Sequence, residues 1–132
     1  MEKKRVLIID DEEIVRRSCK RVLETEGYDV VLASSGENAL LEMEKDAFDL
    51  VITDLIMPDM DGFELIQSIK TRWPKHRIVV MTGYGTHDAN ERSLELGASG
   101  FLKKPFLPDD LISVANSAKI PGDKYSYFDK FD

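Results

Sequence analysis

The chain contains a single cysteine, so no disulfide can form within it. Cys19 falls among the apolar positions of a helical pattern, which favours a packed thiol over a reactive one. Long apolar runs are also missing, because none approaches the roughly 20 residues that a helix needs to cross a bilayer. The apolar run that follows Arg5 is too short for a signal peptide. These absences predict a cytoplasmic protein with no membrane partner and little redox chemistry.

Basic residues are in deficit, since 18 Lys and Arg stand against 25 Asp and Glu and the formal net charge is −7. A nucleic-acid surface needs concentrated Lys and Arg, so direct nucleic-acid binding is not expected. Part of the acidity is local, in the unbroken run Asp10, Asp11, Glu12 and Glu13. Carboxylates crowded beside an apolar strand repel one another unless a cation neutralises them. A solvated face is the commoner role of a charge run, but this run favours a metal site.

Short apolar, β-branched runs alternate along the chain with stretches of helical spacing. Strands are expected within 5–9, 28–33, 48–54, 77–81 and 101–103, each followed by a helix. Because right-handed crossovers admit few other arrangements, this alternation predicts a parallel sheet with helices on both faces. We expect an α/β, flavodoxin-like (βα)5 doubly wound fold with strand order 2-1-3-4-5.

The 132 residues suit one domain, which we place over 1–120. The remainder, 121–132, is polar with interleaved aromatic residues and receives no assigned structure. A short tail or the start of a linker is the simpler interpretation of this segment. An aromatic strip that docks on the domain or on a partner is the alternative.

Two helices give specific expectations. The first should start at Glu12 and stop at Gly27, because glycine commonly follows a last helical turn. Its expected buried stripe comprises Ile14, Val15, Ser18, Cys19, Val22 and Leu23. In the second, Ser34 followed three residues later by Glu37 is typical of a capping box.

The helix expected at about 88–96 differs from the others in its thin apolar stripe of Ala89, Leu94 and Leu96. Burial of apolar side chains supplies most of what holds a surface helix on its sheet. A thin stripe therefore predicts weak anchoring, and we expect this helix to be mobile.

Polar or charged residues follow four of the five expected strands. Asp10 and Asp11 follow the first strand, Asp54 ends the third, Thr82 ends the fourth and Lys104 follows the fifth. The carboxyl ends of parallel strands share one edge, and ligands bind there in the crevice between strands 1 and 3. Taken one at a time, each residue has a plainer role as a turn former, a strand end or a surface lysine. Their convergence on one edge favours a joint site.

The motifs around these residues resemble the receiver domain of two-component response regulators. They are IIDDEE at 8–13, TDLIMPDMDG at 53–62, MTGYGT at 81–86 and FLKKPF at 101–106. The similarity covers roughly Lys4 to Ala118. The resemblance implies a phosphorylation-activated signalling protein whose donor is a sensor histidine kinase or a phosphotransfer protein.

By this resemblance Asp54 is the phosphoacceptor, Thr82 and Lys104 contact the phosphoryl group, and Phe101 is the switch aromatic. Asp54 would act as nucleophile on a phosphohistidine and form an acyl phosphate. An aromatic residue in a short strand is also typical of a core, so Phe101 has a second interpretation. The output would be a changed surface over the fourth helix, fifth strand and fifth helix. A downstream protein, an output domain or a second copy in a homodimer would bind that surface.

The resemblance also implies a divalent cation, Mg²⁺ or Mn²⁺, held by Asp10, Asp11, Asp54 and the backbone carbonyl of Ile56. Carboxylates, a carbonyl and waters are the hard oxygen ligands that Mg²⁺ prefers. Ile56 and Tyr84 are bulky, and they stand two residues beyond Asp54 and Thr82, where family members flank the route of the attacking water. Slow autodephosphorylation is therefore expected.

The sequence disfavours two other function classes. An aspartyl-phosphate hydrolase acting on small phosphoesters also uses a strand-end Asp, but such enzymes carry a second Asp two residues later, where Ile56 stands. A flavodoxin-like cofactor site would need glycine and backbone amides where this chain has carboxylates. We therefore expect a signalling phosphoacceptor that catalyses only its own Mg²⁺-dependent phosphoryl transfer, rather than an enzyme acting on other substrates.

Overall fold

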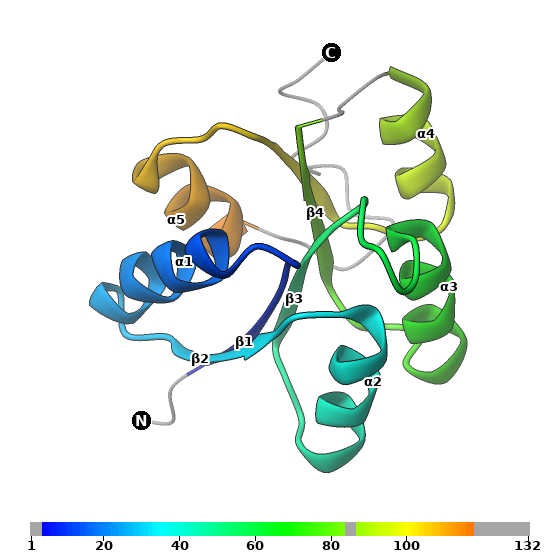
Figure 1. Ribbon diagram of the computed structural model, residues 1–132, viewed down its shortest axis with the longest axis horizontal. Coiled ribbons are helices and arrows are strands. Elements are labelled where there is room, and N and C mark those ends of the chain that lie inside the picture. Colours follow the sequence, from blue (N-terminus) through cyan, green and yellow to red (C-terminus); the bar gives the residue numbers. More distant parts are fainter. Residues whose placement is uncertain (1–3, 84–86, 118–132) are drawn as a thin grey trace.

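The computed structural model describes residues 4–83 and 87–117, in which strands and helices alternate (Figure 1). The strands are β1 (Arg5–Ile9), β2 (Asp29–Ala33), β3 (Leu50–Asp54), β4 (Ile78–Thr82) and β5 (Gly100–Lys103). The helices are α1 (Glu13–Thr25), α2 (Gly36–Lys45), α3 (Gly62–Arg72), α4 (His87–Glu95) and α5 (Pro108–Ser117). All strand pairs are parallel and the sheet order is β2-β1-β3-β4-β5. The predicted fold class and strand order are confirmed.

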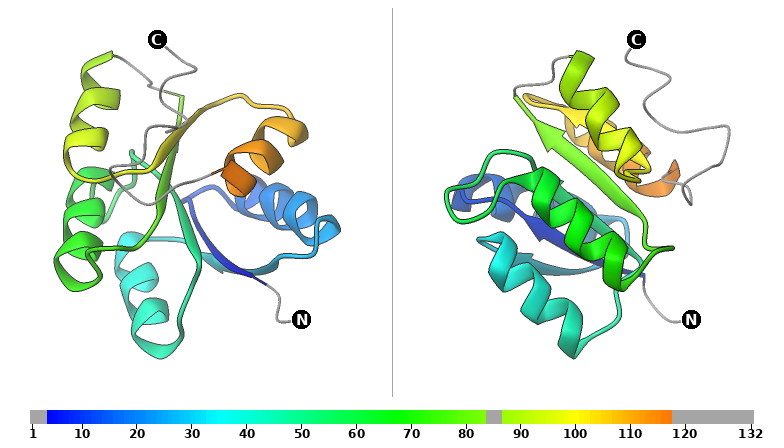
Figure 2. Two further views of the ribbon diagram at one scale, coloured as in Figure 1. Left: turned by 180° about the vertical axis from the view of Figure 1, so that it is seen from behind. Right: turned by 90° about the vertical axis from the view of Figure 1, so that its right-hand side faces the viewer.

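Two layers of helices cover the two faces of the sheet. Helices α1 and α5 lie on one side, and α2, α3 and α4 lie on the other (Figures 1 and 2). Successive residues of a strand point to opposite faces, so Val6 and Ile8 pack with α1 and α5, whereas Leu7 and Ile9 pack with α2 and α3. Every residue of β3 and β4 is buried, as expected for central strands covered on both faces.

Helix α1 differs from the predicted helix in its first turn. Within the expected stripe Cys19 and Leu23 are buried, but Ile14 is 75% exposed and Ser18 is also exposed. The expected stop is confirmed, since Gly27 follows the helix with a φ of +87°. The stripe was wrong at Ile14 and Ser18, because both residues face an open groove beside the loop that follows β5.

The predicted caps and stripes of α2 and α4 also needed correction. Helix α2 is capped by Ser35, whose hydroxyl accepts a hydrogen bond from the Asn38 amide at 3.1 Å, and not by Ser34. In α4, Leu94 is 48% exposed, and Ser93 is the one fully buried residue that the structure describes there. The anchoring of α4 is thus even thinner than the sequence indicated, because Leu94 points away from the core.

Three predictions depend on residues beyond those described. Tyr84 lies in the gap at 84–86, and the tail at 121–132 and the domain boundary at 120 also lie outside the described residues. Within the described part of the chain, no helix is both long enough and apolar enough to cross a membrane. The cytoplasmic location stays a prediction.

Candidate functional site

Strand register brings the predicted site residues to one edge of the sheet. Ile9 of β1 pairs with Thr53 of β3, so Asp10 and Asp54 come next in neighbouring strands. Both carboxylates are buried. On the other side β4 pairs with β5, and the Lys104 amide donates to the Thr82 carbonyl at 3.0 Å. The edge predicted from the order of the strands is therefore occupied by Asp10, Asp54, Thr82 and Lys104.

The Lys104 ammonium bridges the two buried carboxylates. Its Nζ lies 2.5 Å from Asp10 Oδ2 and 3.0 Å from Asp54 Oδ2, and Glu12 Oε1 is farther away at 3.9 Å. Burial acts to lower the pKa of Lys104, but the hydrogen bonds and charges of Asp10 and Asp54 outweigh it and the pKa is raised. Lys104 is therefore a cation at neutral pH, aimed at the predicted phosphoacceptor.

Backbone amides orient the same two carboxylates. The Glu12 amide donates to Asp10 Oδ1 at 2.9 Å, and the Ile56 amide donates to Asp54 Oδ1 at 3.2 Å. The Arg16 guanidinium also donates to the Asp10 carbonyl at 2.8 Å, which ties α1 to the end of β1. Each carboxylate thus presents one oxygen to an amide and the other to Lys104, so the rotation of both side chains is restricted.

Carboxylate oxygens of Asp10, Asp11 and Glu12 lie within 4.8 Å of one another. Asp11 and Glu12 are exposed, which leaves room for the waters that Mg²⁺ retains in proteins, so the donor set fits a hard divalent cation. Glu12 belongs to the acidic run but was not among the predicted ligands. Asp54 stands outside this group and is joined to Asp10 through Lys104.

Phe101 lies in the core rather than at the site edge. Its ring is 1% exposed and belongs to the apolar cluster on the face covered by α2 and α3. Its strand nevertheless adjoins β4, where Val80 pairs with Phe101 two residues before Thr82. The core interpretation of Phe101 is confirmed, and its switch role stays a prediction.

Sequence reasoning missed the exposure of three large apolar side chains, Ile14, Ile56 and Leu107. These side chains are 75%, 55% and 69% exposed, and they come from the three segments that follow β1, β3 and β5. Ile14 also lines a groove of about 610 Å³ between α1 and the segment after β5, together with Lys104, Pro105 and Phe106. The sequence signal that could have revealed these side chains was the presence of large apolar residues in the segments that follow the strands.

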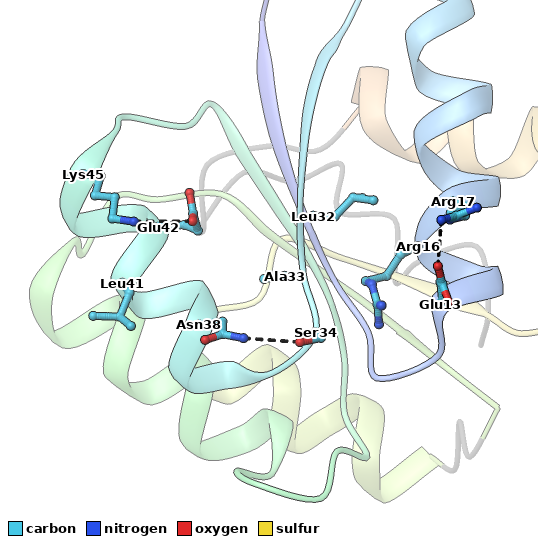
Figure 3. A pocket seen from close by; sticks show the side chains of 10 residues that line it. All are labelled: Glu13, Arg16, Arg17, Leu32, Ala33, Ser34, Asn38, Leu41, Glu42 and Lys45. Carbon is cyan, nitrogen blue, oxygen red and sulfur yellow. Dashed lines mark hydrogen bonds and ion pairs between the residues drawn. The ribbon is translucent and has the colours of Figure 1, made fainter.

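A second pocket, of about 460 Å³, lies between α1, β2 and α2 (Figure 3). Its charges are largely satisfied locally, by the pairs Arg17–Glu13 at 2.8 Å and Lys45–Glu42 at 3.8 Å. None of the predicted site residues lines it. The strand-end edge is therefore the better candidate for the functional site.

Comparisons with known proteins point to one family. Residues 6–116 match the response regulator receiver domain. The chain is 36% identical over 111 residues to sporulation initiation phosphotransferase F of Bacillus subtilis, covering 84% of this chain and 90% of that protein. It is 35% identical over 121 residues to response regulator protein FleR of Pseudomonas aeruginosa, covering 89% and 26%. A CheY-like receiver domain protein from Methanospirillum hungatei has a TM-score of 0.83 at 34% identity, covering 87% and 92%.

Several relatives are much longer than this chain, which spans 26% of FleR and 45% of the alkaline phosphatase synthesis regulatory protein PhoP of Bacillus subtilis. The activities of those whole proteins therefore belong to chains much longer than this one. The family match itself covers most of the chain, including the site edge and all five strands except the first residue of β1. The chain belongs to the response regulator receiver domain family.

Proposed function

We propose that this chain is a phosphorylation-activated receiver in which Asp54 accepts a phosphoryl group from the phosphohistidine of a sensor histidine kinase or phosphotransfer protein. The observation that carries the proposal is the contact of the partly buried Lys104 ammonium with the buried carboxylates of Asp54 and Asp10 at the ends of three strands. The similarity to a named phosphotransferase supports it. The output in this proposal is a contact with another protein or domain.

In the proposed reaction an Asp54 carboxylate oxygen attacks the phosphorus of the phosphohistidine. The new O–P bond forms while the N–P bond breaks, and its electron pair stays on the imidazole nitrogen. Negative charge is spread over the equatorial phosphoryl oxygens, and the Lys104 ammonium, 3.0 Å from Asp54 Oδ2, is placed to stabilise it. Thr82, at the end of the adjoining strand, would donate its hydroxyl hydrogen to the same group.

The residues that would hold Mg²⁺ or Mn²⁺ are Asp10, Asp11, Asp54 and the Ile56 carbonyl, with Glu12 beside them. When bound, the cation neutralises charge on the phosphoryl oxygens. Lys104 contributes a second positive charge from the side of β5. Because Lys104 bridges Asp10 and Asp54, its ammonium would compete with a cation for these two carboxylates.

A protein donor fits the site better than a small phosphoester. The exposed apolar side chains of Ile14, Ile56 and Leu107, on the segments that follow β1, β3 and β5, offer a protein surface something to bury. A hydrolase of small phosphoesters would need an acid two residues beyond Asp54, where Ile56 is apolar. The same bulky side chain supports slow autodephosphorylation.

We place the output surface over α4, β5 and α5, where a downstream protein, an output domain or a second copy would bind. Helix α4 has little buried area to lose, so its rearrangement costs little. A phosphoryl group can shift this equilibrium only through contacts, to Thr82 and Lys104, that the resting form does not make. Hydrogen exchange with and without beryllofluoride tests this: protection should change in 82–106 and little in 12–47, and a response limited to the loops at 10–13 and 54–58 would refute the output surface.

The acceptor assignment is tested with acetyl phosphate and Mg²⁺, followed by intact-mass measurement. The parent protein should gain one base-labile phosphoryl group, and Asp54→Asn should gain none. Asp29→Asn is the matched control, because Asp29 is an exposed acid at the amino end of β2 and should leave labelling unchanged. Equal labelling of Asp54→Asn and the parent would overturn the assignment.

A further inference from the structure

The loop that joins the phosphoacceptor strand to α3 is fastened to a different helix, α2. The Asp59 carboxylate accepts hydrogen bonds from the Gly36 amide at 3.4 Å and the Glu37 amide at 3.2 Å. These are first-turn amides of α2, which have no partner within their own helix. The carboxylate also lies at the positive end of the helix dipole, which favours a negative charge there.

Packing reinforces this attachment. The Met60 side chain lies against Gly36 so closely that a Cβ at Gly36 would come within 3.0 Å of Met60 Sδ and 3.2 Å of Met60 Cβ. Met57, in the same loop, is buried in the core cluster. The loop thus touches α2 through a charged side chain and an apolar one, both from residues that follow Asp54 by no more than six positions.

The far end of the loop is fixed as well. The Gly62 amide donates to the Leu55 carbonyl at 2.7 Å, and Asp61 caps α3 by accepting from the Glu64 amide at 2.8 Å. Ile56 lies in this loop, and its amide donates a hydrogen bond to Asp54 Oδ1. Ile56 therefore lies in a loop that is held to α2 at Asp59 and Met60 and to the start of α3 at Gly62.

We propose that Asp59 is a positioning residue for phosphoryl transfer. By capping α2 it holds the loop after β3 in the conformation that presents the Ile56 amide to Asp54, and it would keep the Ile56 carbonyl available as a ligand of the proposed cation. This inference rests on the proposed function for its catalytic consequence. Its structural half concerns the loop alone and is testable without cation or phosphodonor.

The experiment compares Asp59→Ala with Ser35→Ala. Ser35 is the matched control, because its hydroxyl caps the same helix by accepting from the Asn38 amide, within α2 itself. Both variants should lose stability to a similar degree, since each removes one cap from the N-terminus of α2. Only Asp59→Ala should release the loop.

The first measurement is hydrogen exchange of the Ile56 and Met57 amides without divalent cation. Exchange should be faster in Asp59→Ala and unchanged in Ser35→Ala, and Asp59→Asn, which keeps one acceptor oxygen, should recover part of the protection. Equal exchange in Asp59→Ala and Ser35→Ala would overturn the proposal, because the role of Asp59 would then be that of an ordinary helix cap.

The second measurement is Mg²⁺ titration of the same variants. Loss of a residue that orients a metal ligand typically weakens metal affinity about tenfold or more, and we expect that loss in Asp59→Ala and not in Ser35→Ala. If the parent protein binds no Mg²⁺, the proposed function fails, while the exchange comparison still decides the positioning role. Faster loop exchange with unaltered Mg²⁺ affinity would overturn the catalytic half of the inference.

Discussion

Replacing Lys104 by Met should destabilise the protein by about 3 kcal/mol at neutral pH. The substitution removes the ammonium that separates two buried carboxylates, while the Met side chain keeps the length and apolar packing of the lysine stem. Charges 3.0 Å apart at an effective dielectric constant of about 20 attract by about 5.5 kcal/mol. Part of this loss is offset in the variant, because the cost of burying the Lys104 ammonium is no longer present. The remaining carboxylates of Asp10 and Asp54 repel each other, which lowers the stability of the variant further.

The pH dependence of this contribution follows from the sign of the Lys104 shift. Its pKa is raised from 10.5 in the folded protein, so the stabilisation is fully present below pH 10.5 and is lost only as pH rises through the folded-state pKa. The difference between parent and Lys104→Met should therefore stay constant between about pH 7 and 9.

Urea unfolding monitored by circular dichroism, with a chelator present, measures the effect. Lys103→Met is the matched control, because Lys103 is the exposed neighbour and should change stability by no more than about 0.5 kcal/mol. Adding Asp10→Asn to Lys104→Met should recover part of the loss, since one of the repelling charges is removed. If Lys104→Met unfolds at the same urea concentration as Lys103→Met, the bridging role of Lys104 is wrong.

Three further perturbations test other parts of the structure. Asp11→Ala should abolish Mg²⁺ binding and phosphorylation while leaving the fold equally or more stable, because an exposed, repelled carboxylate is lost; unchanged affinity by titration would contradict this. Gly62→Ala should cost about 3 kcal/mol in urea unfolding, since its Cβ would lie 2.4 Å from Leu55 Cα; parent-like stability would refute that contact. Burial lowers the pKa of His76, so stability should fall as pH drops below 6.5, whereas His76→Gln should lack this component; parallel pH curves would exclude it.

The fold and the members of the site were predictable from the sequence because both depend on local patterns. Apolar runs of strand length alternating with helical spacing leave one common topology, and residues at the ends of parallel strands must meet at one edge. The sequence pattern therefore predicted correctly that one edge of the sheet carries Asp10, Asp54, Thr82 and Lys104. The burial of Phe101 followed from the same logic, as an aromatic residue within a strand.

Other features were decided by tertiary structure. The helical pattern predicted Ile14 to be buried, but its side chain is exposed. Whether the first turn of α1 is covered depends on the position of the loop after β5, which leaves an open groove beside Ile14. The choice of Ser35 over Ser34 as cap depends on where α2 begins over the sheet.

The sequence by itself determined which residues reach the site edge, since strand order follows from the alternation of apolar runs. It did not determine their partners. The bridge from Lys104 to Asp10 spans 94 positions, and the caps from Asp59 to Gly36 and Glu37 span 23 and 22. Hydrogen bonds and ion pairs form only over a few ångströms, whereas the sequence pattern tells only which helix, strand or loop contains a residue. The distances between residues of different elements are set by the packing of the helices on the sheet. These contacts were therefore decided by the tertiary structure.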